Sequence, residues 1–233
     1  MISLPVRTGL LAALLATTAL AGAPAVAADL PASRPEALAP APVLPQWNPW
    51  MIRARALMVA PRDDATLYAS GERLFGANIN VSNSVVPELD ITYFFTPNLA
   101  AELILGVTPH RIKGAGALAG APIGKAWLLP PTLTLQYHFT GLGAFKPYVG
   151  AGVNYTMFFD EQARGDFTSF RLKDSFGFAL QAGFDYMLDA HWGINFDVKK
   201  IFLETDVKVN NGAVQGKARL DPWLISTGVT YRF

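Results

Sequence analysis

The chain has 233 residues with 19 basic and 18 acidic side chains, so its net charge of +1 gives no indication of a nucleic-acid partner. It contains no cysteine, which excludes a disulfide framework, although 51% of its residues are hydrophobic. No run of about 18 apolar residues follows the first 28 residues, so helical membrane spans are not expected.

Residues 1–28 have the organisation of a secretory signal peptide. Arg7 provides the positive region, residues 10–21 form an apolar run, and residues 25–28 are mostly small, as a cleavage site requires. The predicted cut follows Ala28, with Ala27 as the alternative. The apolar run is too short to span a bilayer as a helix, so we expect export rather than anchoring.

Residues 29–49 are rich in proline and alanine, a composition that disfavours both helix and sheet. We interpret this stretch as a proline-rich periplasmic segment that acts as a spacer. A docking segment for the cell wall or for a partner is the alternative.

From residue 50 onward, apolar and polar residues alternate in eight stretches, which indicates β-strands with one apolar face. The stretches are residues 50–60, 88–95, 99–107, 132–139, 146–157, 175–187, 192–205 and 223–233. The long connections between them are residues 64–86, 108–131, 158–174 and 206–221, and the remaining connections are short turns. Residues 50–233 are therefore predicted to form an all-β, eight-stranded antiparallel transmembrane β-barrel of the cell outer membrane, with its short turns in the periplasm.

The last stretch keeps its apolar face up to the final residue, where Tyr231 and Phe233 lie on that face. A transmembrane barrel needs such a strand at its end because the last strand must pair with the first. Tyr231 and Phe233 resemble the signal that the barrel-assembly machinery reads.

The other face of these stretches carries charged residues, which a membrane barrel would place in its lumen. The predicted lumen network consists of Arg53, Arg55, Asp90, Glu102, His138, Asp185, Asp197 and Lys199. Two interpretations remain open: a structural set of ion pairs, or a polar plug below a more apolar upper lumen. Side chains are expected to fill an eight-stranded barrel, so an open aqueous pore is not predicted.

Aromatic residues gather near both ends of the predicted strands, as expected for girdles at the membrane–water boundaries. The periplasmic girdle consists of Trp50, Tyr93, Phe95, Tyr137, Phe139, Tyr148, Tyr186, Trp192, Tyr231 and Phe233. The outer girdle consists of Phe158, Phe159, Phe176, Phe202 and Trp223. A soluble barrel would show the opposite pattern, with polar residues outside and apolar residues inside.

Several stretches resemble the outer membrane protein W (OmpW) family. They are Leu129-Pro130-Pro131-Thr132-Leu133, residues 146–155 followed by Phe158-Phe159-Asp160, Leu172-Lys173-Asp174-Ser175, and Leu220-Asp221-Pro222-Trp223 with Tyr231-Arg232-Phe233. The resemblance covers the whole predicted barrel. It implies an eight-stranded barrel whose narrow lumen is associated with passage of small hydrophobic molecules. In the family, a Trp often follows the Asp-Ser pair before the sixth strand, and this position is Phe176 here.

We therefore expect a passive conduit for small hydrophobic molecules, with lateral exit to the bilayer. The candidate lumen path consists of Leu57, Val59, Ile104, Leu224 and Phe176. Residues 114–121, rich in glycine and alanine, are predicted to form a flexible apolar vestibule. A non-transporting structural or surface-interaction barrel, acting through its extracellular loops, is the alternative.

An enzyme is not expected, since His110, His138 and His191 lie on different predicted elements and no serine is evidently paired with them. The sequence has no metal-ligand spacing, so no catalytic residue, metal or cofactor is predicted. The expected partners are the lipid bilayer, lipopolysaccharide, the barrel-assembly machinery and small hydrophobic solutes. The barrel is expected to be a monomer.

Overall fold

The computed structural model describes residues 47–62 and 64–233. The predicted signal peptide lies outside the described residues, as does the proline-rich segment apart from residues 47–49. The described part of the chain contains one helix, the 3₁₀-helix η1 (Asn210–Gly212). No helix in that part is long and apolar enough to cross a membrane.

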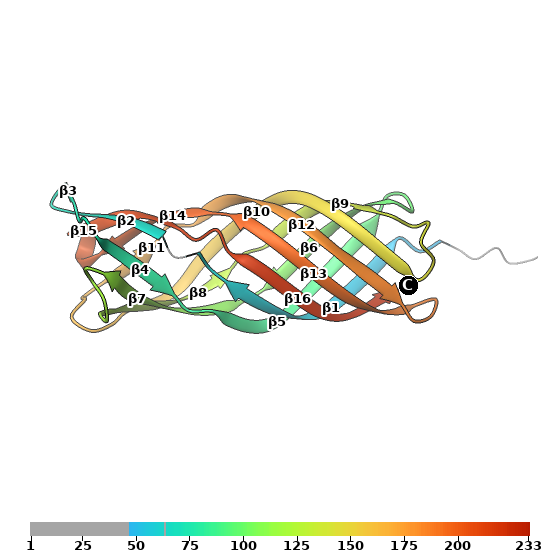
Figure 1. The fold of residues 1–233 in the computed structure, drawn as a ribbon, viewed down its shortest axis with the longest axis horizontal. Coiled ribbons are helices and arrows are strands. Elements are labelled where there is room, and N and C mark those ends of the chain that lie inside the picture. Colours follow the sequence, from blue (N-terminus) through green and yellow to red (C-terminus); the bar gives the residue numbers. More distant parts are fainter. Residues whose placement is uncertain (1–46, 63) are drawn as a thin grey trace, which may run out of the picture. The chain divides into compact units, whose positions relative to one another are not determined.

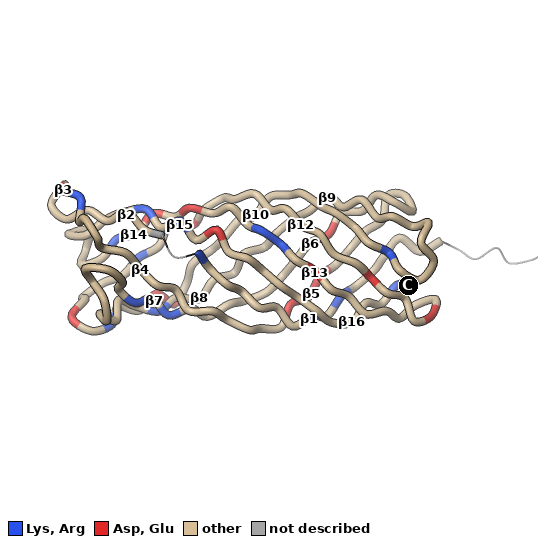
Figure 2. The backbone as a smooth tube through the Cα atoms, viewed as in Figure 1, with Lys and Arg blue, Asp and Glu red and all other residues tan. Residues whose placement is uncertain are grey.

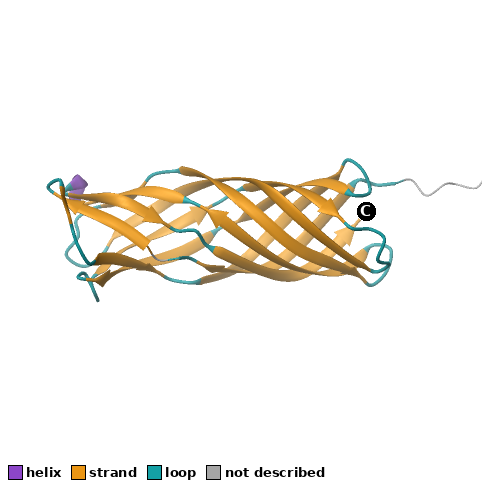
Figure 3. Cartoon of the chain, turned by 45° about the horizontal axis from the view of Figure 1, so that its top comes forward, coloured by secondary structure: helices purple, strands orange, loops and turns teal. Residues whose placement is uncertain are grey.

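Within the described residues, eight strands pair with antiparallel neighbours and close into a barrel (Figures 1 and 3). In order around the barrel they are β1 (Trp50–Ala60), β5 (Ser84–Phe94), β6 (Leu99–Gly106), β9 (Thr132–His138), β10 (Phe145–Ala163), β12 (Ser175–Met187), β13 (Trp192–Phe202) and β16 (Trp223–Arg232). Pairing of β16 with β1 joins the last strand to the first. The predicted eight-stranded antiparallel barrel is confirmed.

Short turns join β5 to β6, β9 to β10 and β12 to β13 at one end of the barrel. The start of β1 and the carboxyl terminus lie at this same end, where Phe233 N donates to the carbonyl oxygen of Trp50 at 3.2 Å (Figure 1). We call it the turn end, and we call the opposite end, where the longer connections lie, the hairpin end.

The longer connections contain further strands, so their prediction as loops is wrong. These strands are β2 (Asp64–Ala69), β3 (Glu72–Arg73), β4 (Ala77–Val81), β7 (Thr108–Gly116), β8 (Pro122–Leu129), β11 (Phe170–Leu172), β14 (Glu204–Val209) and β15 (Val214–Arg219). Strands β4, β7 and β8 continue the sheet from β10, and the others form a five-stranded sheet. The barrel wall therefore extends well beyond the eight predicted strands.

Strand β7 shows why these segments pair rather than form loops. Thr108, His110 and Ile112 are buried on its inner face, and the residues between them are exposed. This alternation with a period of two continues that of β6. Glycine and alanine in the connection concealed the pattern, whereas pairing with β4 and β8 satisfies the backbone hydrogen bonds.

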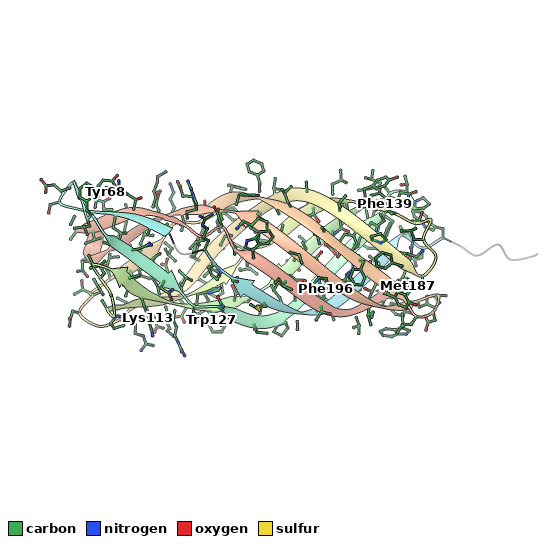
Figure 4. All side chains as sticks on the ribbon, viewed as in Figure 1. Tyr68, Lys113, Trp127, Phe139, Met187 and Phe196 are labelled. Atoms are coloured by element: carbon green, nitrogen blue, oxygen red, sulfur yellow. The ribbon has the colours of Figure 1, made fainter. Side chains whose placement is uncertain are left out.

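The outer face of the barrel is apolar, and the half of its lumen nearer the turn end, called the lower lumen, is polar. Leu133 is 52% exposed and Phe178 is 70% exposed, whereas Gln136 and Asp197 are fully buried inside. Figure 4 shows side chains projecting outward along the whole wall. This arrangement suits a hydrocarbon solvent, because the strands satisfy their own backbone hydrogen bonds and present apolar side chains to lipid.

Aromatic rings surround the turn end. The ring centroid of Tyr231 lies 4.8 Å from that of Trp192 and 4.9 Å from that of Phe233. Two members of the predicted girdles are wrong. Tyr148 is 1% exposed inside the lumen, and Phe158 packs against the apolar cluster inside the hairpin end. Both follow the alternation of β10, which the girdle prediction did not apply to them.

Candidate functional site

The lower lumen is filled by a charged plug, defined here as Arg53, Arg55, Glu88, Asp90, Glu102, Asp185, Asp197 and Lys199. All of these side chains are buried. The structure thus brings together every charged residue of the predicted network and adds Glu88. Glu88 lies on the inner face of β5, two residues before Asp90, so the alternation could have identified it.

Arg53 links three strands across the lumen. Its Nε and Nη2 atoms donate to Asp185 Oδ1 and Oδ2 at 3.0 and 2.6 Å, a bidentate contact. Its Nη1 atom contacts Glu102, and its guanidinium lies 4.8 Å from the centroid of the Tyr148 ring. Thr230 donates a further hydrogen bond of 2.6 Å to Asp185 Oδ1. One guanidinium therefore holds β1 against both β6 and β12.

Arg55 and Lys199 provide the positive charges of the part of the plug that is nearer the hairpin end. Arg55 Nε lies 2.7 Å from Glu88 Oε1, and Nη2 lies 2.7 Å from Asp90 Oδ2. These N–H groups do not point along hydrogen-bond directions, so the contacts are ionic. Lys199 Nζ donates to Asp197 Oδ1 at 2.7 Å. Because buried charges are costly unless paired, these contacts account for the burial of the set.

Neutral polar side chains fill the space between the charges. Gln181 Nε2 donates to Glu102 and Asp197, and Tyr148 donates its hydroxyl to Asp197 Oδ2 at 2.8 Å. His138, predicted as part of the network, contacts Gln136 Oε1 through Nε2 at 3.0 Å, and its ring packs against Tyr148. The plug leaves little room for water or solute at this level.

On the hairpin-end side of the plug, which we call above it, the inner face changes from charged to apolar at the same height on β1 and on β13. On β1, Leu57 follows Arg55 by two residues on the inner face, and on β13, Ile201 follows Lys199 in the same way. These residues begin the lining of a cavity of about 70 Å³, which extends into the hairpin end. We call it the apolar cavity. Its volume is below the ~300 Å³ of an ordinary small-molecule pocket, so an aromatic solute would have to displace side chains.

The predicted path residues fall into two groups. Leu57, Val59 and Leu224 line the apolar cavity. Ile104 is buried on the inner face of β6, but it is not part of the lining. The placement of Phe176 in the lumen is wrong. This side chain is 77% exposed on the outer face of β12, because an odd number of steps separates it from the inward-facing residues of that strand.

The wall beside the apolar cavity contains a break in its hydrogen-bonded ladder. Pairing between β6 and β9 ends at Ile104 and Thr132, and pairing between β7 and β8 starts at Thr108 and Leu128. Within the described residues, no backbone pairing joins residues 105–107 to residues 129–131.

Two prolines lie beside this break. Pro130 and Pro131 have no N–H group and cannot donate to a neighbouring strand. Residue 131 faces β10, since the Pro131 carbonyl accepts from Tyr155 N, so Pro130 is the one of the two whose missing donor faces residues 105–107. Inside the barrel, the Pro130 carbonyl accepts hydrogen bonds from Thr132 Oγ1 and Asn154 Nδ2. Thr108, Leu128 and Pro130 flank the break and also line the apolar cavity. The cavity therefore abuts an unpaired part of the wall.

The family model for the OmpW family matches residues 49–233. The chain belongs to the OmpW family. The y4mB outer-membrane protein of Sinorhizobium fredii is 54% identical over 90% of both chains. The dibenzothiophene metabolism operon protein PahQ of Pseudomonas aeruginosa is 33% identical over 81% of this chain and 92% of its own length.

The same architecture occurs in the crystal structure of outer membrane protein OprG from Pseudomonas aeruginosa. It has a TM-score of 0.76 and 33% identity, covering 80% of this chain and 96% of OprG. This OmpW-family chain is thus a β-barrel of the outer membrane. In outer-membrane barrels of this kind the short turns lie on the periplasmic side and the longer connections on the extracellular side.

The remaining predicted roles concern chemistry and assembly. Among the described residues, no group of three or more His, Asp or Glu side chains is arranged to hold a metal ion. The predicted role of Tyr231 and Phe233 as an assembly signal stays a prediction, and their rings lie on the outer face at the turn end.

Proposed function

We propose that this OmpW-family barrel allows small hydrophobic molecules to pass passively from outside into the apolar cavity and to leave sideways into the bilayer. The observation that carries this proposal is the charged plug directly below the apolar cavity. A hydrophobic solute would lose contact energy and disrupt buried ion pairs if it continued downward. The break beside Pro130 and Pro131 offers an apolar route instead.

The class of solute follows from the lining and from the relatives. An apolar cavity selects molecules through removal of apolar surface from water, which is worth roughly 25 cal/mol per Å². Similarity to a protein named for a dibenzothiophene metabolism operon supports hydrophobic and aromatic solutes. The barrel would supply a path, and the concentration gradient would drive the flow.

The test is uptake of a small apolar fluorophore by cells with and without the protein, at matched levels of other porins. We expect faster uptake with the protein. Unchanged uptake would overturn the proposal and favour a structural or surface-interaction barrel.

A charge placed in the cavity should block the path. Leu57→Glu is expected to reduce fluorophore uptake several-fold, because a carboxylate among the apolar side chains of the lining is costly to bury and would have to draw water into the path. Leu57→Met preserves volume and apolar character and should retain uptake. If Leu57→Glu fails to assemble, Val207→Glu places the charge higher in the same cavity. Full uptake by an assembled charged variant would contradict the proposed path.

A further inference from the structure

Two neighbouring polar side chains of β7 face the otherwise apolar lining of the cavity. Within the described residues, Thr108, His110 and Thr156 are the polar side chains of its lining. Thr156 already donates a 2.7 Å hydrogen bond to Asn154. Thr108 and His110 are two residues apart on one strand, so both lie on its inner face, and they are 2% and 3% exposed.

The hydrogen bonding of His110 determines what its ring offers to a solute. Its Nδ1 atom lies 2.7 Å from the carbonyl oxygen of Ser82. A carbonyl oxygen can only accept, so Nδ1 carries the hydrogen. In a neutral ring the other nitrogen, Nε2, is then an acceptor. Nε2 has no hydrogen-bond partner among the described residues, nor does the Thr108 hydroxyl.

The His110 ring is neutral at pH 7. Burial lowers the pKa of His110 below its ordinary value of about 6.5, and the hydrogen bond to Ser82 only partly opposes this effect. Within the described residues, no other titratable side chain lines the cavity. On the strands packed against His110, the charged side chains Arg111 and Lys113 of β7 and Lys125 of β8 lie on the outer face, and Ala126 of β8 is its cross-strand partner.

We propose that the cavity prefers hydrophobic molecules that carry one hydroxyl group, such as phenols and alcohols, over hydrocarbons of the same shape. The solute hydroxyl would donate to His110 Nε2 and accept from Thr108 Oγ1. A hydrocarbon in the same place leaves a buried acceptor unpaired, and such groups are costly. A site built around a hydrogen-bonding group discriminates strongly against the analogue that lacks its partner. This inference rests on the proposed function and specifies its solute.

The experiment compares 2-naphthol with 2-methylnaphthalene, in which a methyl group replaces the hydroxyl. Binding of both to the full chain in lipid vesicles is measured against protein-free vesicles. His110→Leu is expected to weaken binding of 2-naphthol about tenfold and to leave binding of 2-methylnaphthalene unchanged or tighter. His110→Gln supplies an amide oxygen as acceptor and should restore much of the preference.

A pH measurement on the unaltered protein provides a test that needs no variant. Because the folded-state pKa of His110 lies below 6.5, the acceptor is present at pH 7. The preference for 2-naphthol over its methyl ether 2-methoxynaphthalene, which can only accept, should disappear as the pH falls through that pKa, since the protonated ring donates from Nε2 and no longer accepts. Binding of 2-methylnaphthalene at each pH controls for changes in the barrel.

The outcomes separate the two proposals. If 2-methylnaphthalene binds and His110→Leu affects both compounds equally or affects neither, this inference is overturned and the proposed function stands. A preference for 2-naphthol over 2-methoxynaphthalene that does not change with pH also overturns it. If neither compound binds above protein-free vesicles, the proposed function falls and this inference falls with it.

Discussion

Replacing Arg53 with methionine is expected to lower the free energy of unfolding of the barrel by about 3–5 kcal/mol. Methionine fills similar space but carries no charge. Its substitution leaves Asp185 without its bidentate partner and Glu102 without its ion-pair partner, and both carboxylates are buried. Denaturant unfolding in lipid vesicles would measure the loss as a lower midpoint at an unchanged slope.

The matched control for this experiment is Arg111→Met, which removes the same charge from the exposed face of β7. We expect that variant to change the free energy of unfolding by less than about 0.5 kcal/mol. Equal stability of the two variants would show that the charged plug does not hold the barrel together.

Replacing Pro130 with alanine is expected to lower fluorophore uptake about fivefold. The substitution returns one N–H donor to the side of the strand that faces residues 105–107, whereas residue 131 faces β10, since the Pro131 carbonyl accepts from Tyr155 N. One restored hydrogen bond would stabilise the closed wall by about 1 kcal/mol. Because 1.4 kcal/mol corresponds to a factor of ten, the open population would fall about fivefold. Uptake by intact cells measures the effect.

Pro147→Ala is the control for a proline lost from the same barrel, since Pro147 lies on β10 near the turn end, away from the break. It should leave uptake unchanged. An assembled Pro130→Ala variant with normal uptake would exclude the break as the exit and would direct the search to another part of the wall.

Alternation along the chain was sufficient to predict the barrel and the contents of its lower lumen. The side-chain period of two depends only on local backbone geometry, so Arg53, Glu102 and Asp197 could be assigned to one face. The same reasoning should have placed Glu88 and Tyr148 inside. Tyr148 shows that an aromatic residue near a strand end belongs to the girdle only when the alternation also places it on the outer face.

Partner choice within the plug could not be predicted. The cross-strand neighbour of Arg53 is Asp90, yet its guanidinium reaches Asp185, which is 132 positions away in the sequence, and Glu102. A long side chain in a narrow lumen can cross to the opposite wall. The position of each charge around the circumference depends on closure and strand register, which are properties of the whole barrel.

The sequence by itself determined the number of main strands, which side chains lie on each strand face, and the placement of charged side chains in the lumen. These features follow from local periodicity and from the lipid that surrounds a membrane barrel. Only the tertiary structure decided the extra strands of the hairpin end, the apolar cavity and the gap beside Pro130. It also decided that the carbonyl of Ser82 sets the hydrogen-bonding state of His110. These features arise where segments distant in sequence meet, and their register is fixed only when the wall closes.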